Sequence, residues 1–368
     1  MADTINVGII GCGNIMAQYV KGIRMFDVLN LIACADLDVE RAKARAAEFG
    51  IPQADSVESL LGDPNVQLVI NLTVPQAHAE VSLAILAAGK HVYSEKPLAL
   101  LREEGQKILA AAREKKLLVG CAPDTFLGGG LQTARKLIDD GQIGRPVAAT
   151  AFMMSHGPES WHPNPFFYYQ PGGGPMFDMG PYYLTALIHL LGPVKRVSGS
   201  TQVSFTERTA TSKHHPNVKI PVEVHTHVTG LMDFEKGAVG TIITSFDVWG
   251  HHMPPIEIYG SDGSLSVPDP NMFGGKVLLH RYDTNNWQEI PLTHDSQMVR
   301  GIGPADMAMA LCFGRPHRAT GELAYHVLDI MHAFHDSSET GNHINLNSTC
   351  AQPAPLPAGM KMGELDRA

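Results

Sequence analysis

Two glycines near the N-terminus constrain the fold of this 368-residue chain more than any other feature. An apolar run over residues 5–10 ends at Gly11-Cys12-Gly13, and beyond it apolar residues recur at helical spacing. Glycines between a strand and a helix permit a tight turn and let backbone approach a pyrophosphate. The amides of Asn14 and Ile15 then stand at the positive end of the helix. The segment predicts a dinucleotide-binding turn.

An acidic residue, Asp36, closes the second predicted strand at the distance where a carboxylate takes the ribose hydroxyls of a dinucleotide. Asp38 follows, and no basic residue occurs before Arg41, so the phosphate of NADP would meet negative charge. NAD is therefore the expected cofactor, in preference to NADP. Met16 stands where a third glycine or alanine is usual, and the alternative is a glycine turn that serves chain geometry alone.

Strands and helices alternate through the first third of the chain, which predicts a doubly wound parallel α/β Rossmann domain over residues 1–123. The expected strands are 5–10, 28–35, 68–72, 91–94 and 117–121, and the expected helices are 38–49, 76–88 and 101–115. Later strands alternate apolar and polar residues and are joined by tight turns, as over 222–234 and 239–248. Residues 124–368 are thus expected to form an α+β domain with a mainly antiparallel sheet. The proline-rich stretch after Gln352 is expected to be a surface tail.

Charge and composition limit the classes of partner that this chain is expected to bind. The 37 acidic and 28 basic residues give a net charge of −9, and no basic cluster is present, which argues against nucleic acid or an anionic membrane. No apolar stretch approaches the ~20 residues of a membrane span, and no basic residue of a signal peptide precedes Lys21. The five widely spaced cysteines are typical of reduced thiols. We expect a cytoplasmic protein that binds a small molecule.

A lysine follows the predicted strand 91–94, in Glu95-Lys96-Pro97. Ligands of open parallel sheets bind at the carboxyl ends of the strands. A lysine there can lower the pKa of a substrate hydroxyl or relay its proton. The alternative is a solvated surface lysine, the commoner fate of this residue type.

These motifs together resemble the Gfo/Idh/MocA oxidoreductases. The resemblance rests on residues 8–15, on Thr73-Val74-Pro75 with His78, on Gly89-Lys90-His91-Val92 leading to Glu95-Lys96-Pro97, and on 143–144, 172–174 and 178–180. It implies a Rossmann domain followed by an α+β domain whose large open sheet forms a homodimer or homotetramer. It also implies that Lys96 is catalytic, and that Thr73, Pro75, His78, Glu95 and Lys96 lie at the cofactor.

A second polar segment, residues 171–191, places Asp178, Tyr182 and Thr185 at helical spacing, with Pro181 expected to kink the helix or restart it. Tyr182 stands where many family members carry histidine, in which it is similar to glucose–fructose oxidoreductase and dimeric dihydrodiol dehydrogenase. Thr185 replaces the family's second aspartate. A phenol beside a lysine can serve as acid and base, so Tyr182 is expected to act with Lys96 while Asp178 positions the reacting oxygen.

Aromatic and polar residues suited to carbohydrate occur just before this segment. Trp161, His162 and Tyr168 offer ring faces and hydrogen-bonding tips. With Asp124, Asp178, Tyr182, Thr185 and His326 they form the expected substrate site, although an aromatic interface loop explains the first three equally well. Among the 18 histidines, His225 and His227 have a spacing that can bind zinc on a strand, but no third ligand follows at a suitable spacing, so no metal is expected.

The sequence thus predicts an NAD-dependent oxidoreductase that acts on CH–OH groups. Hydride would pass to or from a secondary hydroxyl or carbonyl of a sugar, polyol or glycoside. One alternative is an NAD-dependent glycoside hydrolase that oxidises its substrate transiently, eliminates the aglycone and reduces the sugar again. Another is a regulator that senses the nucleotide without catalysis.

Overall fold

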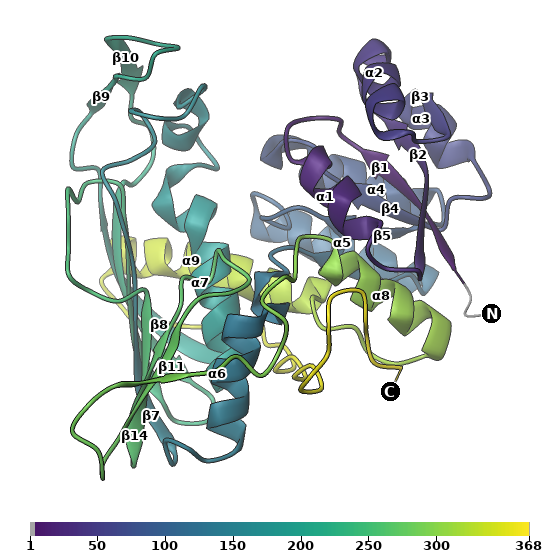
Figure 1. Ribbon diagram of the computed structural model, residues 1–368. Coiled ribbons are helices and arrows are strands. Elements are labelled where there is room, and N and C mark those ends of the chain that lie inside the picture. Colours follow the sequence, from purple (N-terminus) through teal and green to yellow (C-terminus); the bar gives the residue numbers. More distant parts are fainter. Residues whose placement is uncertain (1–3, 368) are drawn as a thin grey trace. The chain divides into compact units, whose positions relative to one another are not determined.

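A computed structural model describes residues 4–367, which form two compact units (Figure 1). The N-terminal unit contains the chain up to Gln132, Thr293–Leu328 and the segment from Pro353 onward. The sheet unit contains Thr133–Leu292 and Asp329–Gln352. This division differs from the expected boundary between residues 123 and 124, because two later segments return to the N-terminal unit.

The N-terminal unit is built on a six-stranded sheet of order β3-β2-β1-β4-β5-β6, in which every pair is parallel. The strands are β1 (Ile5–Ile10), β2 (Leu29–Ala35), β3 (Gln53–Asp55), β4 (Leu68–Asn71), β5 (His91–Ser94) and β6 (Val119–Cys121). The strand order reverses between β1 and β4, where doubly wound sheets bind their ligands. The expected Rossmann architecture is confirmed, although the short β3 was not foreseen.

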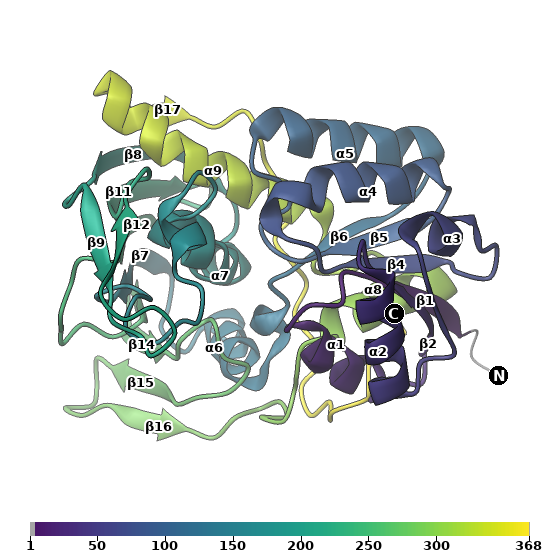
Figure 2. The ribbon, with the colours of Figure 1, turned by 90° about the horizontal axis from the view of Figure 1, so that it is seen from above.

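Helices cover both faces of this sheet (Figure 2), with α4 and α5 on one face and α1 and α8 on the other. They are α1 (Met16–Ile23), α2 (Val39–Phe49), α3 (Val57–Gly62), α4 (His78–Ala87) after the 3₁₀ turn η1 (Pro75–Ala77), α5 (Arg102–Lys115) and α8 (Ile302–Phe313). Local signals set the bounds of α2, since the Asp38 carboxylate accepts from the Arg41 amide and Gly50 ends the helix in the left-handed region. Within the described residues, no helix is long and apolar enough to cross a membrane.

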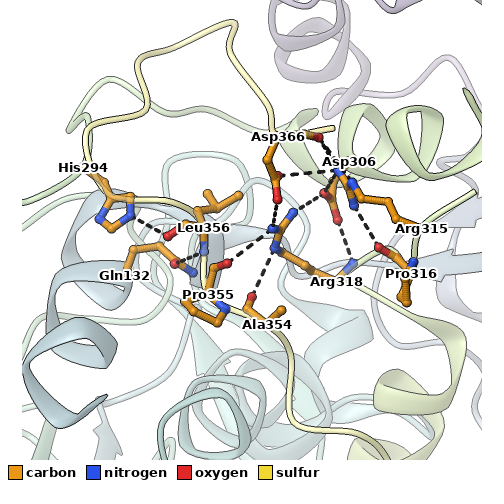
Figure 3. Close-up of polar contacts among 10 residues, drawn as sticks. All are labelled: Gln132, His294, Asp306, Arg315, Pro316, Arg318, Ala354, Pro355, Leu356 and Asp366. Atoms are coloured by element: carbon orange, nitrogen blue, oxygen red, sulfur yellow. Dashed lines mark hydrogen bonds and ion pairs between the residues drawn. The ribbon is translucent and has the colours of Figure 1, made fainter. Parts of the chain in front are cut away.

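The segment after Gln352 lies largely at the surface, as predicted, since only Pro353 and Leu356 among its described residues are buried; side-chain contacts nevertheless fix it within the N-terminal unit (Figure 3). Arg318 donates to the carbonyl oxygen of Ala354 at 3.1 Å and forms a 2.6 Å ion pair with Asp366. Leu356 is buried, its amide donates to Gln132 and its carbonyl lies 3.0 Å from Nε2 of His294. Side chains distant in sequence thus satisfy the polar backbone of this proline-rich segment.

The sheet unit contains a nine-stranded sheet of order β16-β15-β14-β13-β7-β12-β11-β8-β17. Its strands are β7 (Pro146–Met154), β8 (Val194–Gln202), β11 (His227–Phe234), β12 (Val239–Ser245), β13 (Ile256–Gly260), β14 (Gly263–Val267), β15 (Val277–Arg281), β16 (Gln288–Ile290) and β17 (Ile344–Asn345). Neighbouring strands are antiparallel except β7 and β12, which confirms the predicted mainly antiparallel sheet. A separate ribbon joins β9 (Glu207–Ala210) to β10 (Val218–Pro221).

Two helices complete the core of the sheet unit. Helix α7 (Gly174–Leu191) packs on β7, β11 and β12. Helix α9 (Gly321–Thr340) contributes Phe334, whose backbone lies against Gly199 and whose ring lies against Gly230, the glycine that pairs with Gly199. A Cβ on Gly230 would lie 2.2 Å from the Phe334 ring, so only glycine lets the aromatic ring pack this closely on the sheet. Helix α6 (Gly129–Asp139) precedes β7 in the chain.

Candidate active site

The predicted dinucleotide turn lies between β1 and α1. Gly11 has a φ of +101°, and a Cβ there would lie 2.6 Å from the carbonyl group of Leu72 at the end of β4. Only glycine tolerates both this positive φ and this close approach of the neighbouring backbone. A Cβ on Gly13 would meet nothing within 4 Å, so its backbone faces open space of the kind that a pyrophosphate needs. Asn14 and Ile15 lead into α1, and Ile15 is its N-cap residue. The residues present fit a dinucleotide.

The Asp36 carboxylate closes the same turn. Its Oδ2 accepts from the Cys12 amide at 2.8 Å, and its Oδ1 accepts from the Asp38 amide at 3.0 Å. Arg41 is the first basic residue after Asp36 in the sequence. Its guanidinium lies 3.6 Å from Oδ1 of Asp36 and also forms a 3.3 Å ion pair with Asp38. Two carboxylates therefore surround one guanidinium, and the edge of the turn keeps a net negative charge.

The loop after β4 is organised by a buried amide that sequence reasoning missed. Oδ1 of Asn71 accepts from both the amide and the hydroxyl of Thr73, at 3.2 and 2.7 Å. Its Nδ2 donates to the His78 carbonyl at 3.1 Å. Pro75 opens η1 directly afterwards. The signal available in the sequence was a polar residue ending an apolar strand.

His78 joins the loops that follow β4 and β5. Its Nδ1 lies 2.7 Å from the Pro97 carbonyl and its Nε2 lies 3.0 Å from the Thr73 carbonyl. Burial lowers the pKa of His78, against the opposing effect of these carbonyls. The imidazole is buried, so the structure gives it a positioning role, and its direct contact with a cofactor stays a prediction.

The backbone before Lys96 is held by Glu95. The Glu95 carboxylate accepts from the Tyr19 hydroxyl at 2.7 Å and from the Lys96 amide at 3.0 Å, and Arg300 lies 3.6 Å away. Lys96 itself is half-buried at the carboxyl end of β5. Sequence reasoning missed Tyr19 and Arg300, since neither belongs to a recognisable motif and both are far from Glu95 in the chain.

Asp124 has a different environment from the one expected. Its side chain is fully buried, and Oδ2 accepts from the amides of Gly301 and Gly303 at 2.9 and 3.1 Å. The carboxylate thus caps the start of α8. Burial raises its pKa, and the amides and Arg300 lower it by less. Backbone amides take Oδ2 because α8 needs a partner for its first amides. Oδ1 is buried and has no hydrogen-bond partner within the described residues, so contact of Asp124 with a sugar hydroxyl stays a prediction.

The second catalytic segment lies on α7 in the sheet unit, with Asp178 half-buried and Tyr182 and Thr185 buried. The helix runs from Gly174 to Leu191 through Pro181, so it does not restart there, although proline leaves one carbonyl without its helical donor. A Cβ on Gly173 would lie 2.5 Å from the Phe167 carbonyl oxygen, so the start of α7 packs directly on the 3₁₀ turn η3 (Phe166–Tyr169).

The three predicted aromatic residues form one cluster within the sheet unit. The rings of Trp161 and His162 are 5.3 Å apart, and those of His162 and Tyr168 are 5.1 Å apart, both edge to face. Trp161 is 65% exposed, so its indole is available to a ligand. Because Tyr168 belongs to η3, the cluster adjoins the start of the helix that carries Asp178 and Tyr182.

His326 is fully buried on α9, in the part of that helix that belongs to the N-terminal unit. Its contact with substrate stays a prediction. Among residues 4–367, no group of three or more histidine, cysteine or acidic side chains is arranged to hold a metal ion.

Comparison with known proteins adds sequence relationships to this geometry. Residues 5–122 match the family described as "Oxidoreductase family, NAD-binding Rossmann fold", and residues 131–266 match the "GFO/IDH/MocA C-terminal domain". The 1,5-anhydro-D-fructose reductase of Ensifer adhaerens is 29% identical over 70% of this chain and 74% of its own. The levoglucosan dehydrogenase of Pseudarthrobacter phenanthrenivorans is 26% identical over 72% of this chain and 73% of its own.

A solved structure of a levoglucosan dehydrogenase, described as a complex with NADH and L-sorbose, has the same fold. Its TM-score is 0.80 at 22% identity, and the alignment covers 94% of this chain and 99% of that one. The two family matches cover both the dinucleotide turn and the start of α7, where the candidate residues lie. The chain belongs to the GFO/IDH/MocA family of NAD(P)-dependent oxidoreductases.

Proposed function

We propose that this oxidoreductase uses NAD, in preference to NADP, to transfer hydride to or from a secondary hydroxyl or carbonyl of a sugar, polyol or glycoside. The observation that carries the cofactor choice is Asp36, whose carboxylate is fixed by the Cys12 amide beside the open backbone of Gly13. A carboxylate so placed accepts from ribose hydroxyls and repels a 2′-phosphate. Arg41 does not reverse this preference, because Asp36 and Asp38 together outweigh its charge.

Lys96, Tyr182 and Asp178 are the proposed catalytic residues. When bound, the dinucleotide supplies the hydride acceptor or donor at its nicotinamide ring. The Lys96 ammonium and the Tyr182 phenol exchange the hydroxyl proton, and the Asp178 carboxylate orients the reacting oxygen. Lys96 belongs to the N-terminal unit and the other two to the sheet unit, so their action on one substrate is part of the proposal.

The substrate class is supported by the aromatic cluster of Trp161, His162 and Tyr168. An exposed indole can stack on the C–H face of a sugar ring while nearby polar groups bind its hydroxyls. The names of two relatives, a levoglucosan dehydrogenase and a 1,5-anhydro-D-fructose reductase, point to sugars. Thr185, also on α7, is proposed as a further residue that contacts the substrate.

Assembly through the nine-stranded sheet is also proposed, as a homodimer or homotetramer. Leu231 on β11 and Val239 on β12 are large apolar residues that are exposed on this sheet. Analytical ultracentrifugation of the purified protein would measure the subunit number, and a strictly monomeric protein would contradict the proposal.

The function is tested with a panel of sugars, polyols and glycosides, each incubated with NAD and with NADP. The absorbance of NADH or NADPH measures turnover. We expect turnover of at least one substrate with NAD. Tyr182→Phe and Asp178→Asn should lower kcat by about 100-fold while the Kd for NAD stays unchanged. The matched control is Tyr183→Phe, a buried neighbour on the same helix, which should keep near-normal kcat.

Two other outcomes would overturn the proposal. Tight NAD binding without turnover of any substrate would indicate a nucleotide sensor. Release of an aglycone without net NADH would indicate a hydrolase that recycles its cofactor.

A further inference from the structure

A cavity of about 420 Å³ lies in the sheet unit, and none of its lining residues is assigned to the proposed reaction. Its walls come from the loop after β7, from β9 with its flanking residues, and from the loop after β12 (β9 is in teal at the upper left of Figure 1). The lining residues are His156, Glu159, Ser160, Phe205, Glu207, Arg208, Thr209, Thr211 and Trp249. Cavities of this size are typical of small-molecule sites.

Buried charge at this cavity does not suit an anionic ligand. The Arg208 guanidinium is buried and pairs with Glu159 at 2.5 Å and with Asp247 at 2.8 Å. Its Nη2 also donates to the His156 and Phe246 carbonyls. The two carboxylates carry more negative charge than the single guanidinium carries positive charge. The guanidinium also already donates its hydrogen bonds to protein acceptors. A phosphate or carboxylate ligand would meet net negative charge here.

An aromatic wall lines the cavity. The Trp249 indole stacks on the His156 imidazole with ring centres 3.4 Å apart and planes tilted by 15°. Trp249 is nevertheless 84% exposed, so much of its indole is left to a ligand, and Phe205 is 52% exposed on the same cavity. Burial and the nearby Arg208 lower the pKa of His156, which keeps the stacked imidazole neutral. Exposed aromatic residues gathered in a cavity commonly mark a binding site.

Polar groups accompany this apolar wall. Ser160, Thr209 and Thr211 contribute hydroxyls, and Glu207 contributes a carboxylate. Within the described part of the chain, Nδ1 of His156 is buried without a hydrogen-bond partner. One stacking surface accompanied by hydroxyls and a carboxylate acceptor matches a neutral sugar ring, which has an apolar C–H face and an edge of hydroxyls.

We propose that this cavity is a second, non-catalytic carbohydrate site that binds one neutral pyranose ring, with Trp249 as its stacking platform. The site does not depend on the proposed function, because no lining residue belongs to the proposed cofactor or catalytic set.

The test is calorimetric titration of the whole protein with the methyl α- and β-glycosides of glucose, galactose and mannose. At least one glycoside should bind saturably, and Trp249→Ala should weaken that binding about tenfold or more. Thr211→Val should also weaken it, while the control Trp287→Ala, at a partly exposed tryptophan elsewhere in the sheet unit, should not. The kcat and KM of the Trp249→Ala enzyme should match those of the wild type, which separates this site from the reaction. Gluconate and inorganic phosphate should not bind to the cavity.

Three outcomes would overturn the inference. One is that no methyl glycoside binds, and another is that binding is unchanged in both the Trp249→Ala and Thr211→Val proteins. The third is that Trp249→Ala dissociates an oligomer in sedimentation, because a second copy of the chain would then cover the cavity.

Discussion

The hydroxyl of Tyr19 on α1 donates a 2.7 Å hydrogen bond to the carboxylate of Glu95, the residue directly before Lys96. The same carboxylate accepts from the Lys96 amide at 3.0 Å. The helix that begins at the dinucleotide turn is thereby connected to the backbone of the proposed catalytic lysine. Arg300, 3.6 Å from Glu95, brings the segment before α8 into the same buried network.

Tyr19→Phe removes the donor and leaves a buried carboxylate oxygen with one partner fewer. We expect a loss of about 1–3 kcal/mol in the free energy of unfolding, together with a lower kcat from a less firmly held Lys96. Urea unfolding and steady-state kinetics measure the two effects. Tyr282→Phe, at an exposed tyrosine, should change neither quantity. A Tyr19→Phe enzyme with wild-type stability and kcat would show that the hydrogen bond to Glu95 neither stabilises the fold nor positions Lys96.

Asp36→Ala should reduce the proposed preference for NAD over NADP by about tenfold or more, since the proposed acceptor for the ribose hydroxyls is lost while Arg41 remains for a 2′-phosphate. The measurement is the ratio of kcat/KM for the two cofactors. Asp38→Ala is the matched control. It removes the cap of α2 and should cost about 1 kcal/mol of stability with a much smaller change in that ratio. An unchanged ratio in the Asp36→Ala enzyme would contradict the assignment.

Arg318 is expected to matter more for stability than any exposed ion pair. It pairs with the fully buried Asp306 and with Asp366 of the C-terminal segment, both at 2.6 Å. Arg318→Met should lower the free energy of unfolding by about 3 kcal/mol, because the buried Asp306 loses one of its two ion pairs and keeps Arg315 and the backbone amide of residue 318. It should also make the segment after Gln352 sensitive to limited proteolysis. Arg113→Met, which breaks a 3.7 Å pair with Glu322 at the surface, should cost less than about 1 kcal/mol.

Stability should fall as the pH is lowered from about 7 to 5. Burial lowers the pKa of His78, His91 and His317 in the folded protein, whereas in the unfolded chain they take up protons near pH 6.5. The unfolded state then binds more protons, so the free energy of unfolding decreases with falling pH.

His317→Gln should make this dependence shallower by up to about 1.4 kcal/mol per pH unit, because one such group is removed. Urea titrations at several pH values measure the slope. The exposed His252→Gln should leave it unchanged. A slope in the His317→Gln protein equal to that of the wild type would contradict a lowered His317 pKa.

The geometry of the candidate cofactor site could be predicted because its signals are local. The glycines of the turn, the acid that ends β2 and the lysine after β5 each follow directly from a strand that the sequence pattern reveals. The same pattern gave the parallel sheet and, further along, the mainly antiparallel one. The aromatic cluster was also predictable, since its residues lie within eight positions of one another.

Contacts between distant segments could not be predicted. Asp124 looked like an acceptor for substrate, and only the fold brings Gly301 and Gly303 to its carboxylate. The segment after Gln352 was expected at the surface, where most of it lies, but its proline-rich composition carries no information about Arg318, the distant residue that anchors it. The supports of Glu95 were missed for the same reason.

The most direct test of the proposed reaction is turnover by the Lys96→Met enzyme, measured beside its Kd for NAD. Methionine keeps most of the length of the unbranched side chain and removes the ammonium group with its charge and protons. We predict that kcat falls by 1,000-fold or so while the Kd for NAD changes less than about threefold. The exposed Lys116→Met should behave as wild type. A Lys96→Met enzyme with near-wild-type kcat would contradict the account.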